Sequence, residues 1–222
     1  LVGSEMCIRD RMTHLVEDLL LLARLDSGRP LEREPVDLSR LCTDVVSDAH
    51  AAGPDHRWNL EVPGEPVLVP GDGARLHQVV ANLLANARVH TPPGSSVTLS
   101  LHTGSLDGDL DEAVLRVADD GPGIPAELQS EVFERFARAD ASRSHKDGST
   151  GLGLAIVKHV AQRHHARLEI DSRVGAGSTF RLRFPKSLVV MPTRAQRPVS
   201  LADAQPDAEA DADYASSVSP SP

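Results

Sequence analysis

Along residues 12–25 the apolar positions recur at spacings of three and four, which is the period of one helix face. Asp26-Ser27-Gly28 and then Pro30 end this pattern. A stripe of this width predicts a long helix that needs a partner helix to cover it. The stripe consists of Met12, Leu15, Val16, Leu19, Leu22 and Leu25.

Two further helices are predicted by the same period and by acidic residues that can cap their first turns. One runs from Asp37, and its apolar face carries Leu38, Leu41, Cys42, Val45 and Ala49. The other runs from Asp72 to about His90, where Thr91-Pro92-Pro93-Gly94 ends it. Its apolar face carries Leu76, Val80, Leu83 and Ala87.

Short apolar runs predict strands between and after these helices. Residues 58–69 indicate two short strands around a Pro63-Gly64 turn, and a helix is predicted from about Gly153 to His165. Strands and helices mix without a strict βαβ repeat, so the fold class is α/β: a two-layer sandwich with a mixed sheet packed on helices. The other predicted strands are 97–102, 113–118, 167–171 and 178–184.

Composition removes several classes of function. The 222 residues carry a formal charge of -9 and are only 3% aromatic, which disfavours nucleic-acid binding. Cys7 and Cys42 are too few for a disulfide framework or a zinc site, which indicates a reducing, cytoplasmic setting. Because no apolar run reaches the length of a membrane span, we expect no membrane contact from these residues.

The two ends of the chain differ from its middle. The sequence starts at Leu1, and we expect residues 1–11 to be a non-native or frayed leader without functional weight. The acidic, Ala-, Pro- and Ser-rich residues 187–222 are expected to be disordered.

Asn82 and Asn86 lie four residues apart on the third predicted helix, so both amides project from one face. An amide oxygen suits Mg²⁺, which prefers oxygen ligands and usually bridges to phosphate oxygens. Taken alone, two exposed asparagines on a helix are also ordinary surface residues.

Asp119 follows a predicted strand and leads the loop DDGPGIP. Its carboxylate can only accept hydrogen bonds, so it suits the exocyclic amine of adenine. Gly121 and Gly123 allow the backbone to approach a flat ligand closely. A plain Asp-Gly and Pro-Gly turn is the alternative.

A second glycine-rich loop, residues 148–154, opens a predicted helix, so free N–H groups and the helix dipole can face phosphates. It is neither a P-loop, which needs Lys and Ser/Thr after its last glycine, nor a dinucleotide fingerprint, which follows a strand. A flexible glycine-rich linker remains an alternative. Between the two loops lie the apolar segment VFERF and the basic residues Arg138, Arg143, His145 and Lys146, which form either a lid over phosphates or a solvated loop.

Five segments occur in an order that selects among these alternatives. They are NLLANARVHTPPG, DDGPGIP, VFERF, GSTGLGLAIV and GAGSTFRLRFP. This series, over roughly residues 72–185, resembles the N, G1, F and G2 boxes and last strand of bacterial sensor histidine kinases. The stretch RMTHLVEDLLLLARLD also resembles the second helix of that family's dimerisation and phosphotransfer domain.

The resemblance implies a Bergerat-type ATP-binding domain preceded by one long helix of a helical-hairpin dimerisation domain. It implies that Asn86 binds Mg²⁺, that Asn82 lies near the metal and phosphates, and that Asp119 binds adenine. The ATP-binding residues that it implies are Asn82, Asn86, His90, Asp119, Gly121, Gly123, Ile124, Arg138, Thr150, Gly151, Leu152, Gly153, Leu154 and Ser178. The implied parts are the leader 1–11, the dimerisation helix 12–28, a linker with a helix and first strands 29–70, the ATP-binding core 71–186 and the tail 187–222.

The chain departs from the family's pattern in three places. Val89 stands where a basic residue is frequent, with Arg88 turned about 100° away on the helix. Ser149 stands where a glycine is common. None of the ten histidines has the sequence context of the family's phosphoacceptor, so the chain lacks its own substrate histidine and no catalytic residue is assigned.

By resemblance, the function is transfer of the ATP γ-phosphate to a histidine, for relay to an aspartate of a response regulator. The implied partners are a second copy, through the helical hairpin, and the receiver domain of that regulator. The implied location is the cytoplasmic side of the bacterial inner membrane, with the full-length protein anchored there. An ATP hydrolase of the same superfamily, an anti-sigma factor kinase and a non-catalytic ATP-sensing module are the alternatives.

Overall fold

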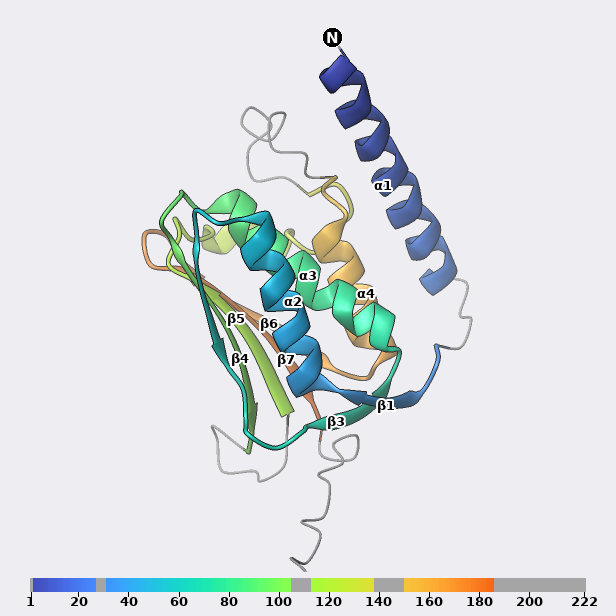
Figure 1. Cartoon of the computed structure of the whole chain (residues 1–222), viewed down its shortest axis with the longest axis vertical. Coiled ribbons are helices and arrows are strands. Elements are labelled where there is room, and N and C mark those ends of the chain that lie inside the picture. The colour runs from blue at the N-terminus through green and yellow to red at the C-terminus, as the bar shows by residue number, and fades with distance from the viewer. Residues whose placement is uncertain (1, 27–30, 105–112, 138–149, 186–222) are drawn as a thin grey trace, which may run out of the picture. The chain divides into compact units, whose positions relative to one another are not determined.

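The computed structural model describes residues 2–26, 31–104, 113–137 and 150–185. Helices and strands are mixed along the chain, with one 3₁₀ turn, and three times two strands follow each other directly (Figure 1). They are α1 Val2–Asp26, β1 Glu34–Asp37, α2 Leu38–Ala52, β2 Arg57–Glu61, β3 Leu68–Gly71, α3 Gly73–His90, β4 Ser96–Thr103, β5 Ala113–Asp119, η1 Ala126–Leu128, α4 Gly153–Arg163, β6 Arg167–Arg173 and β7 Gly177–Phe184.

Five strands form a mixed sheet in the order β2-β4-β5-β7-β6. Strand β2 runs parallel to β4, and every other pair in this sheet is antiparallel. Strands β1 and β3 form a separate antiparallel pair. The two strands on either side of the Pro63-Gly64 turn, β2 and β3, therefore do not pair with each other and belong to different sheets.

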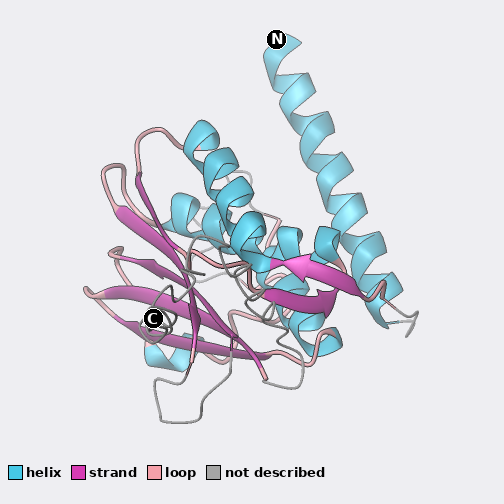
Figure 2. Ribbon diagram, turned by 60° about the horizontal axis from the view of Figure 1, so that its bottom comes forward, coloured by secondary structure: helices cyan, strands magenta, loops and turns pink. Residues whose placement is uncertain are grey.

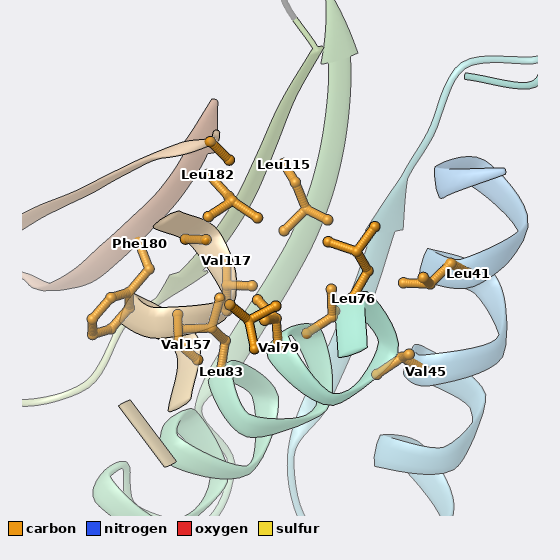
Figure 3. Close-up of a cluster of buried hydrophobic side chains, with 14 of the residues drawn as sticks. Leu41, Val45, Leu76, Val79, Leu83, Leu115, Val117, Val157, Phe180 and Leu182 are labelled. Atoms are coloured by element: carbon orange, nitrogen blue, oxygen red, sulfur yellow. The ribbon is translucent and has the colours of Figure 1, made fainter. Parts of the chain in front are cut away.

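Helices α2, α3 and α4 cover one face of the five-stranded sheet, which gives the predicted two-layer α/β sandwich (Figures 1 and 2). The core lies between the two layers, where apolar side chains from the helices and from alternate strand positions meet (Figure 3). Leu41, Val45, Leu76, Val79, Leu83, Leu115, Val117, Val157, Phe180 and Leu182 are members of this cluster.

The two helix starts predicted from acidic residues are confirmed. The Asp37 side chain accepts from the backbone N–H groups of Ser39 and Arg40 at 2.9 and 3.1 Å. The Asp72 side chain accepts from the N–H of Arg75 at 3.1 Å. Such caps satisfy donors that have no partner within the helix.

Helix α1 begins at Val2, ahead of the Met12 at which the periodicity starts. Its predicted stripe is covered only in part: Leu22 and Leu25 are buried, Leu15 is half-buried against the core, and the helix contacts α4. Met12, Val16 and Leu19 remain exposed in this single chain. Among the described helices, none is both long and apolar enough to cross a bilayer.

Several sequence predictions fall outside the described residues. They concern the tail 187–222, the basic residues Arg138, Arg143, His145 and Lys146, and the first two residues of the second glycine loop, Gly148 and Ser149.

Candidate nucleotide site

The carboxylate of Asp119 lies at the C-terminal end of β5 and is held by two backbone N–H groups. Gly121 donates to its Oδ1 at 2.9 Å and Ser178, on the neighbouring strand β7, donates to the same oxygen at 3.3 Å. Both hydrogen bonds found for this carboxylate among the described residues therefore end on Oδ1. The second oxygen, Oδ2, is left to accept a hydrogen bond from a ligand.

Burial raises the pKa of Asp119 above its ordinary value of 3.8. The hydrogen bonds from Gly121 and Ser178 act in the opposite direction, because they favour the ionised form, and the charge of Asp120 adds to the increase. A half-buried carboxylate in this setting gains from a ligand donor that neutralises its remaining oxygen.

The loop after Asp119 packs so closely on its surroundings that a side chain would not fit at two positions. A Cβ at Gly121 would lie 2.4 Å from Cγ2 of Thr91, and one at Gly123 would lie 2.0 Å from the carbonyl oxygen of Arg173. Gly123 also has a φ of 74°, which only glycine adopts without strain. The loop is therefore fixed against the β6–β7 turn.

Two residues that the sequence analysis did not single out, Ser172 and Gln129, hold this loop in place. The Ser172 hydroxyl accepts from the N–H of Ile124 at 2.8 Å and lies 3.0 Å from the Ser178 hydroxyl. The Gln129 side-chain amide donates to the carbonyls of Ile124 and Ser172 at 2.9 and 2.8 Å. Neither residue belongs to a motif, so only the fold shows that they are neighbours of the site.

A cavity of about 800 Å³ lies beside the residues predicted for the phosphates. Its lining includes seven predicted ATP-binding residues: Asn82, Asn86, His90, Thr150, Gly151, Gly153 and Leu154. Arg88 and Val89 line it too, so the part of α3 that departs from the family's pattern faces this same cavity. This volume falls within the range of small-molecule sites in proteins.

The two asparagines use their amides differently. Asn82 donates from Nδ2 to the carbonyl of Gly153 at 3.2 Å, which joins α3 to the start of α4. No hydrogen bond is found for the half-buried Asn86 side chain within the described residues, so its oxygen is available to a cation.

The described part of the chain contains no group of three or more His, Cys, Asp or Glu side chains that suits a metal. Mg²⁺ held by one amide, phosphate and water needs no such group.

The start of α4 is suited to phosphate because no side chain caps it. Leu152 stands at the N-cap position and makes no side-chain hydrogen bond there, unlike the aspartates that cap α2 and α3. The first N–H groups of α4 and the positive end of its dipole therefore remain for an anion. Leu152 itself is fully buried and its N–H donates to the Thr150 hydroxyl at 3.3 Å, so its side chain does not face the cavity.

Helix α1 forms the opposite wall of the cavity through Glu17, Asp18, Leu20, Leu21 and Arg24. Thr150 donates from its hydroxyl to Oδ2 of Asp18 at 3.2 Å. Beyond the cavity, Asp26 forms an ion pair with Arg135, which lowers the pKa of Asp26, and Oδ1 of Asp26 lies 3.3 Å from Nε2 of His159.

The structure gathers the predicted residues into two adjoining groups. One group lies where β5 ends and β7 begins, at the place where Oδ2 of Asp119 can accept a hydrogen bond. It consists of Asp119, Gly121, Gly123, Ile124 and Ser178. The residues from α3 and the start of α4 line the cavity, and the first group is not part of that lining. Arg138 lies outside the described residues. A ligand with a planar, amine-bearing end suits the Asp119 group, and an anionic end on the same ligand suits the cavity.

Residues 71–188 match the family described as histidine kinase-, DNA gyrase B-, and HSP90-like ATPase. The chain is 64% identical to the probable sensor histidine kinase TcrY of Mycobacterium tuberculosis over 176 residues. This aligned segment covers 79% of this chain and 36% of TcrY. It therefore spans about a third of the length of this relative.

Solved structures give the same result. The mycobacterial sensor histidine kinase MprB has a TM-score of 0.59 and 31% identity, over 72% of this chain and 99% of that one. Full-length ShkA, in complex with AMPPNP, has a TM-score of 0.67 and 26% identity, over 82% of this chain and 37% of that one.

Proposed function

Since the chain belongs to the histidine kinase-, DNA gyrase B- and HSP90-like ATPase family, as an ATP-binding domain of the sensor histidine kinase type, we propose that it phosphorylates a histidine. The γ-phosphate of ATP is the donor, and an aspartate of a response regulator receives the phosphoryl group from the histidine. The observation that carries the proposal is the Oδ2 of Asp119, which accepts no hydrogen bond from the described residues, together with a cavity lined by Asn82 and Asn86. His90 lines that cavity and is close enough to act electrostatically on Asp119.

Adenine specificity is assigned to Asp119. The exocyclic amine of adenine donates to Oδ2, while the keto group of guanine would place an acceptor against the same oxygen. The hydrogen bonds from Gly121 and Ser178 keep the carboxylate in a fixed orientation for this contact. Selectivity arises because a mismatched purine leaves a half-buried charge without its partner.

The triphosphate is assigned to the cavity. N–H groups at the start of α4 bind phosphate oxygens, and Asn86 supplies an oxygen ligand to Mg²⁺. The metal neutralises charge on the phosphates when it is bound. His90, Thr150, Gly151, Gly153 and Leu154 complete the lining on this side.

Phosphoryl transfer is mainly a matter of position, so the residues of this chain orient ATP. An imidazole nitrogen from a separate helix attacks the γ-phosphorus, the bond to the β–γ bridging oxygen breaks, and ADP leaves. A hydrolase would instead need a base to orient water. Asn82 stands at the position where hydrolases of this superfamily have a glutamate, and a carboxamide is a poor base. This substitution favours the kinase over the hydrolase.

The assembly is also part of the proposal. Met12, Val16, Leu19 and Leu20 form an exposed apolar strip on α1, and such a strip is suited to packing against helices of a second copy. The receiver domain of a response regulator is the expected second partner, in keeping with the family.

The kinase proposal is tested by mixing the chain with γ-labelled ATP, Mg²⁺ and a polypeptide that supplies the phosphoacceptor helix. We expect label on a histidine, identified by its acid lability and stability in base. The Asp119→Asn variant is the matched control; it should keep the fold and transfer little label. If the folded chain binds ATP but never labels a histidine, the kinase proposal is wrong while the ATP site stands.

A further inference from the structure

The outer face of the five-stranded sheet, which points away from the helices, carries a row of hydrogen-bond donors. Leu99, Leu101, Leu115 and Val117 point into the core, so the residues between them point to the outer face. Ser100 lies directly opposite Arg116, and Arg116 lies directly opposite Arg181. The three side chains therefore stand side by side across β4, β5 and β7, about 5 Å from one to the next.

Two members of this row lack a partner. The Ser100 hydroxyl oxygen is fully buried and has no hydrogen-bond partner among the residues that the structure describes. The half-buried Arg116 has neither a hydrogen bond nor an ion pair within the described part of the chain. Buried polar groups are nearly always satisfied, so the unpaired Ser100 hydroxyl, next to a half-buried guanidinium without a protein partner, points to a bound ligand.

The third member adds a repulsion that an anion would relieve. Like charges directly opposite on neighbouring strands destabilise a sheet, and Arg116 faces Arg181 in this way. Arg181 is only weakly compensated, because its nearest carboxylate oxygen, on Asp171, is 3.6 Å away and that side chain is 61% exposed. By contrast, Arg183 donates to Glu169 at 2.9 Å.

We propose that Ser100, Arg116 and Arg181 form a site for a small tetrahedral oxyanion of the phosphate class. An arginine binds two oxygens of such an anion through its fork of N–H groups, and the hydroxyl donates to a third. The row fits one small anion because Glu61, opposite Ser100, and Glu169, opposite Arg181, place a carboxylate at each end. An acidic polypeptide or a nucleic-acid strand laid across the strands would meet these carboxylates.

This site is separate from the nucleotide site and does not rest on the proposed kinase function. The strands nevertheless link the two sites. Arg116 precedes Asp119 by three residues on β5, and Arg181 follows Ser178 by three residues on β7. An anion bound between the arginines therefore joins the same two strands that hold the Asp119 carboxylate.

The test is a titration of the ¹⁵N-labelled chain with sodium phosphate, with sodium chloride at equal ionic strength as reference. We expect saturable shifts of the arginine side-chain Nε–H signals and of amides around Ser100, Arg116 and Arg181, together with a higher thermal midpoint. Arg116→Gln should weaken the apparent affinity at least about tenfold, since it removes a charge-assisted pair of hydrogen bonds.

Two variants complete the test. Ser100→Ala should also weaken phosphate binding, and it should fold because it only removes an unsatisfied buried hydroxyl. Arg57→Gln changes the net charge as much as Arg116→Gln but lies on the edge strand β2, so it should bind phosphate like the original chain. Equal shifts with chloride, equal affinity in Arg116→Gln, or shifts confined to the amides around Asn86 would each overturn the proposal.

Discussion

The imidazole Nε2 of His164 accepts a hydrogen bond from the backbone N–H of Asp72 at 2.9 Å, and so joins the end of α4 to the start of α3. The other ring nitrogen, Nδ1, lies 2.9 Å from the carbonyl oxygen of Val160 and must donate to it. Since one partner is a donor and the other an acceptor, the ring is neutral with its proton on Nδ1. Burial lowers the pKa of His164.

The folded state should therefore lose stability as the pH falls. Because the pKa of His164 lies below its ordinary value of 6.5, the unfolded chain binds a proton first as the solution is acidified. The stabilisation that neutral His164 gives to the folded state is complete above pH 6.5, and it falls as the pH drops toward the folded-state pKa. Urea unfolding between pH 5 and pH 8 measures it: His164→Gln should flatten this slope, and the exposed His50→Gln should not.

Asp119→Asn should weaken ATP binding without lowering the stability of the fold. The amide nitrogen would point a donor at the adenine amine, and a loss of about 2 kcal/mol corresponds to roughly thirtyfold weaker ATP binding. Burial already raises the pKa of Asp119, so its ionised form opposes folding near neutral pH and the neutral amide should leave the thermal midpoint unchanged or higher. Calorimetric titration and thermal unfolding measure the two effects, and unchanged ATP affinity would remove Asp119 from the adenine role.

Ser172→Ala should weaken ATP binding through the loop. The hydroxyl holds the N–H of Ile124 and contacts the Ser178 hydroxyl, and each lost hydrogen bond is worth about 1 kcal/mol, or roughly fivefold in affinity. Ser172→Thr restores the hydroxyl and should recover most of the affinity. If the alanine and threonine variants bind ATP equally well, the hydroxyl does not position the loop.

Gly177→Ala should destabilise the fold more than Gly175→Ala. Both glycines have positive φ angles, 85° and 81°, so both alanines carry the same backbone strain of about 1 kcal/mol. A Cβ at Gly177 would also lie 1.9 Å from the carbonyl oxygen of Asp119, whereas nothing lies within 4 Å of one at Gly175. We expect about 2 kcal/mol between the two variants in chemical unfolding; equal losses would show that β7 can move away.

Asn86→Ala should abolish the Mg²⁺ dependence of ATP binding while leaving adenosine binding unchanged, because adenosine has no phosphates to share the metal. Titrations with and without Mg²⁺ measure both. Asn59→Ala, an exposed change on β2, is the control. An equal loss of adenosine affinity would mean that the substitution damages the pocket as a whole.

The helix starts were predictable because they depend on neighbours in the chain. Asp37 and Asp72 cap helices through contacts two or three residues away, which a sequence pattern contains. The pairing of strands was not predictable in the same way. Residues 58–69 contain two strands as expected, yet β2 joins β4 and β3 joins β1, since pairing depends on which apolar faces meet in the core.

The candidate site also contains residues that depend on local sequence and residues that depend on long-range packing. Asp119, Gly121 and Gly123 could be chosen from sequence because carboxylate and glycine chemistry is local to one loop. Ser172 and Gln129 could not, because the hydrogen bonds that join Ser172 to Ile124 and to Gln129 span 48 and 43 residues of the chain, and only the fold brings β6 beside this loop. Similarly, the period of α1 predicted its apolar stripe but not that only its last turns, at Leu22 and Leu25, are buried in this chain.

The sequence by itself determined the family, the α/β class and the residue types of the nucleotide loops, since these depend on ordered motifs and on short-range periodicity. Only the tertiary structure decided which oxygen of Asp119 is available, which carbonyls forbid a side chain at Gly123 and Gly177, and that Arg116 faces Arg181 across the sheet. These relationships depend on strand register, and register is fixed by packing between segments far apart in the chain.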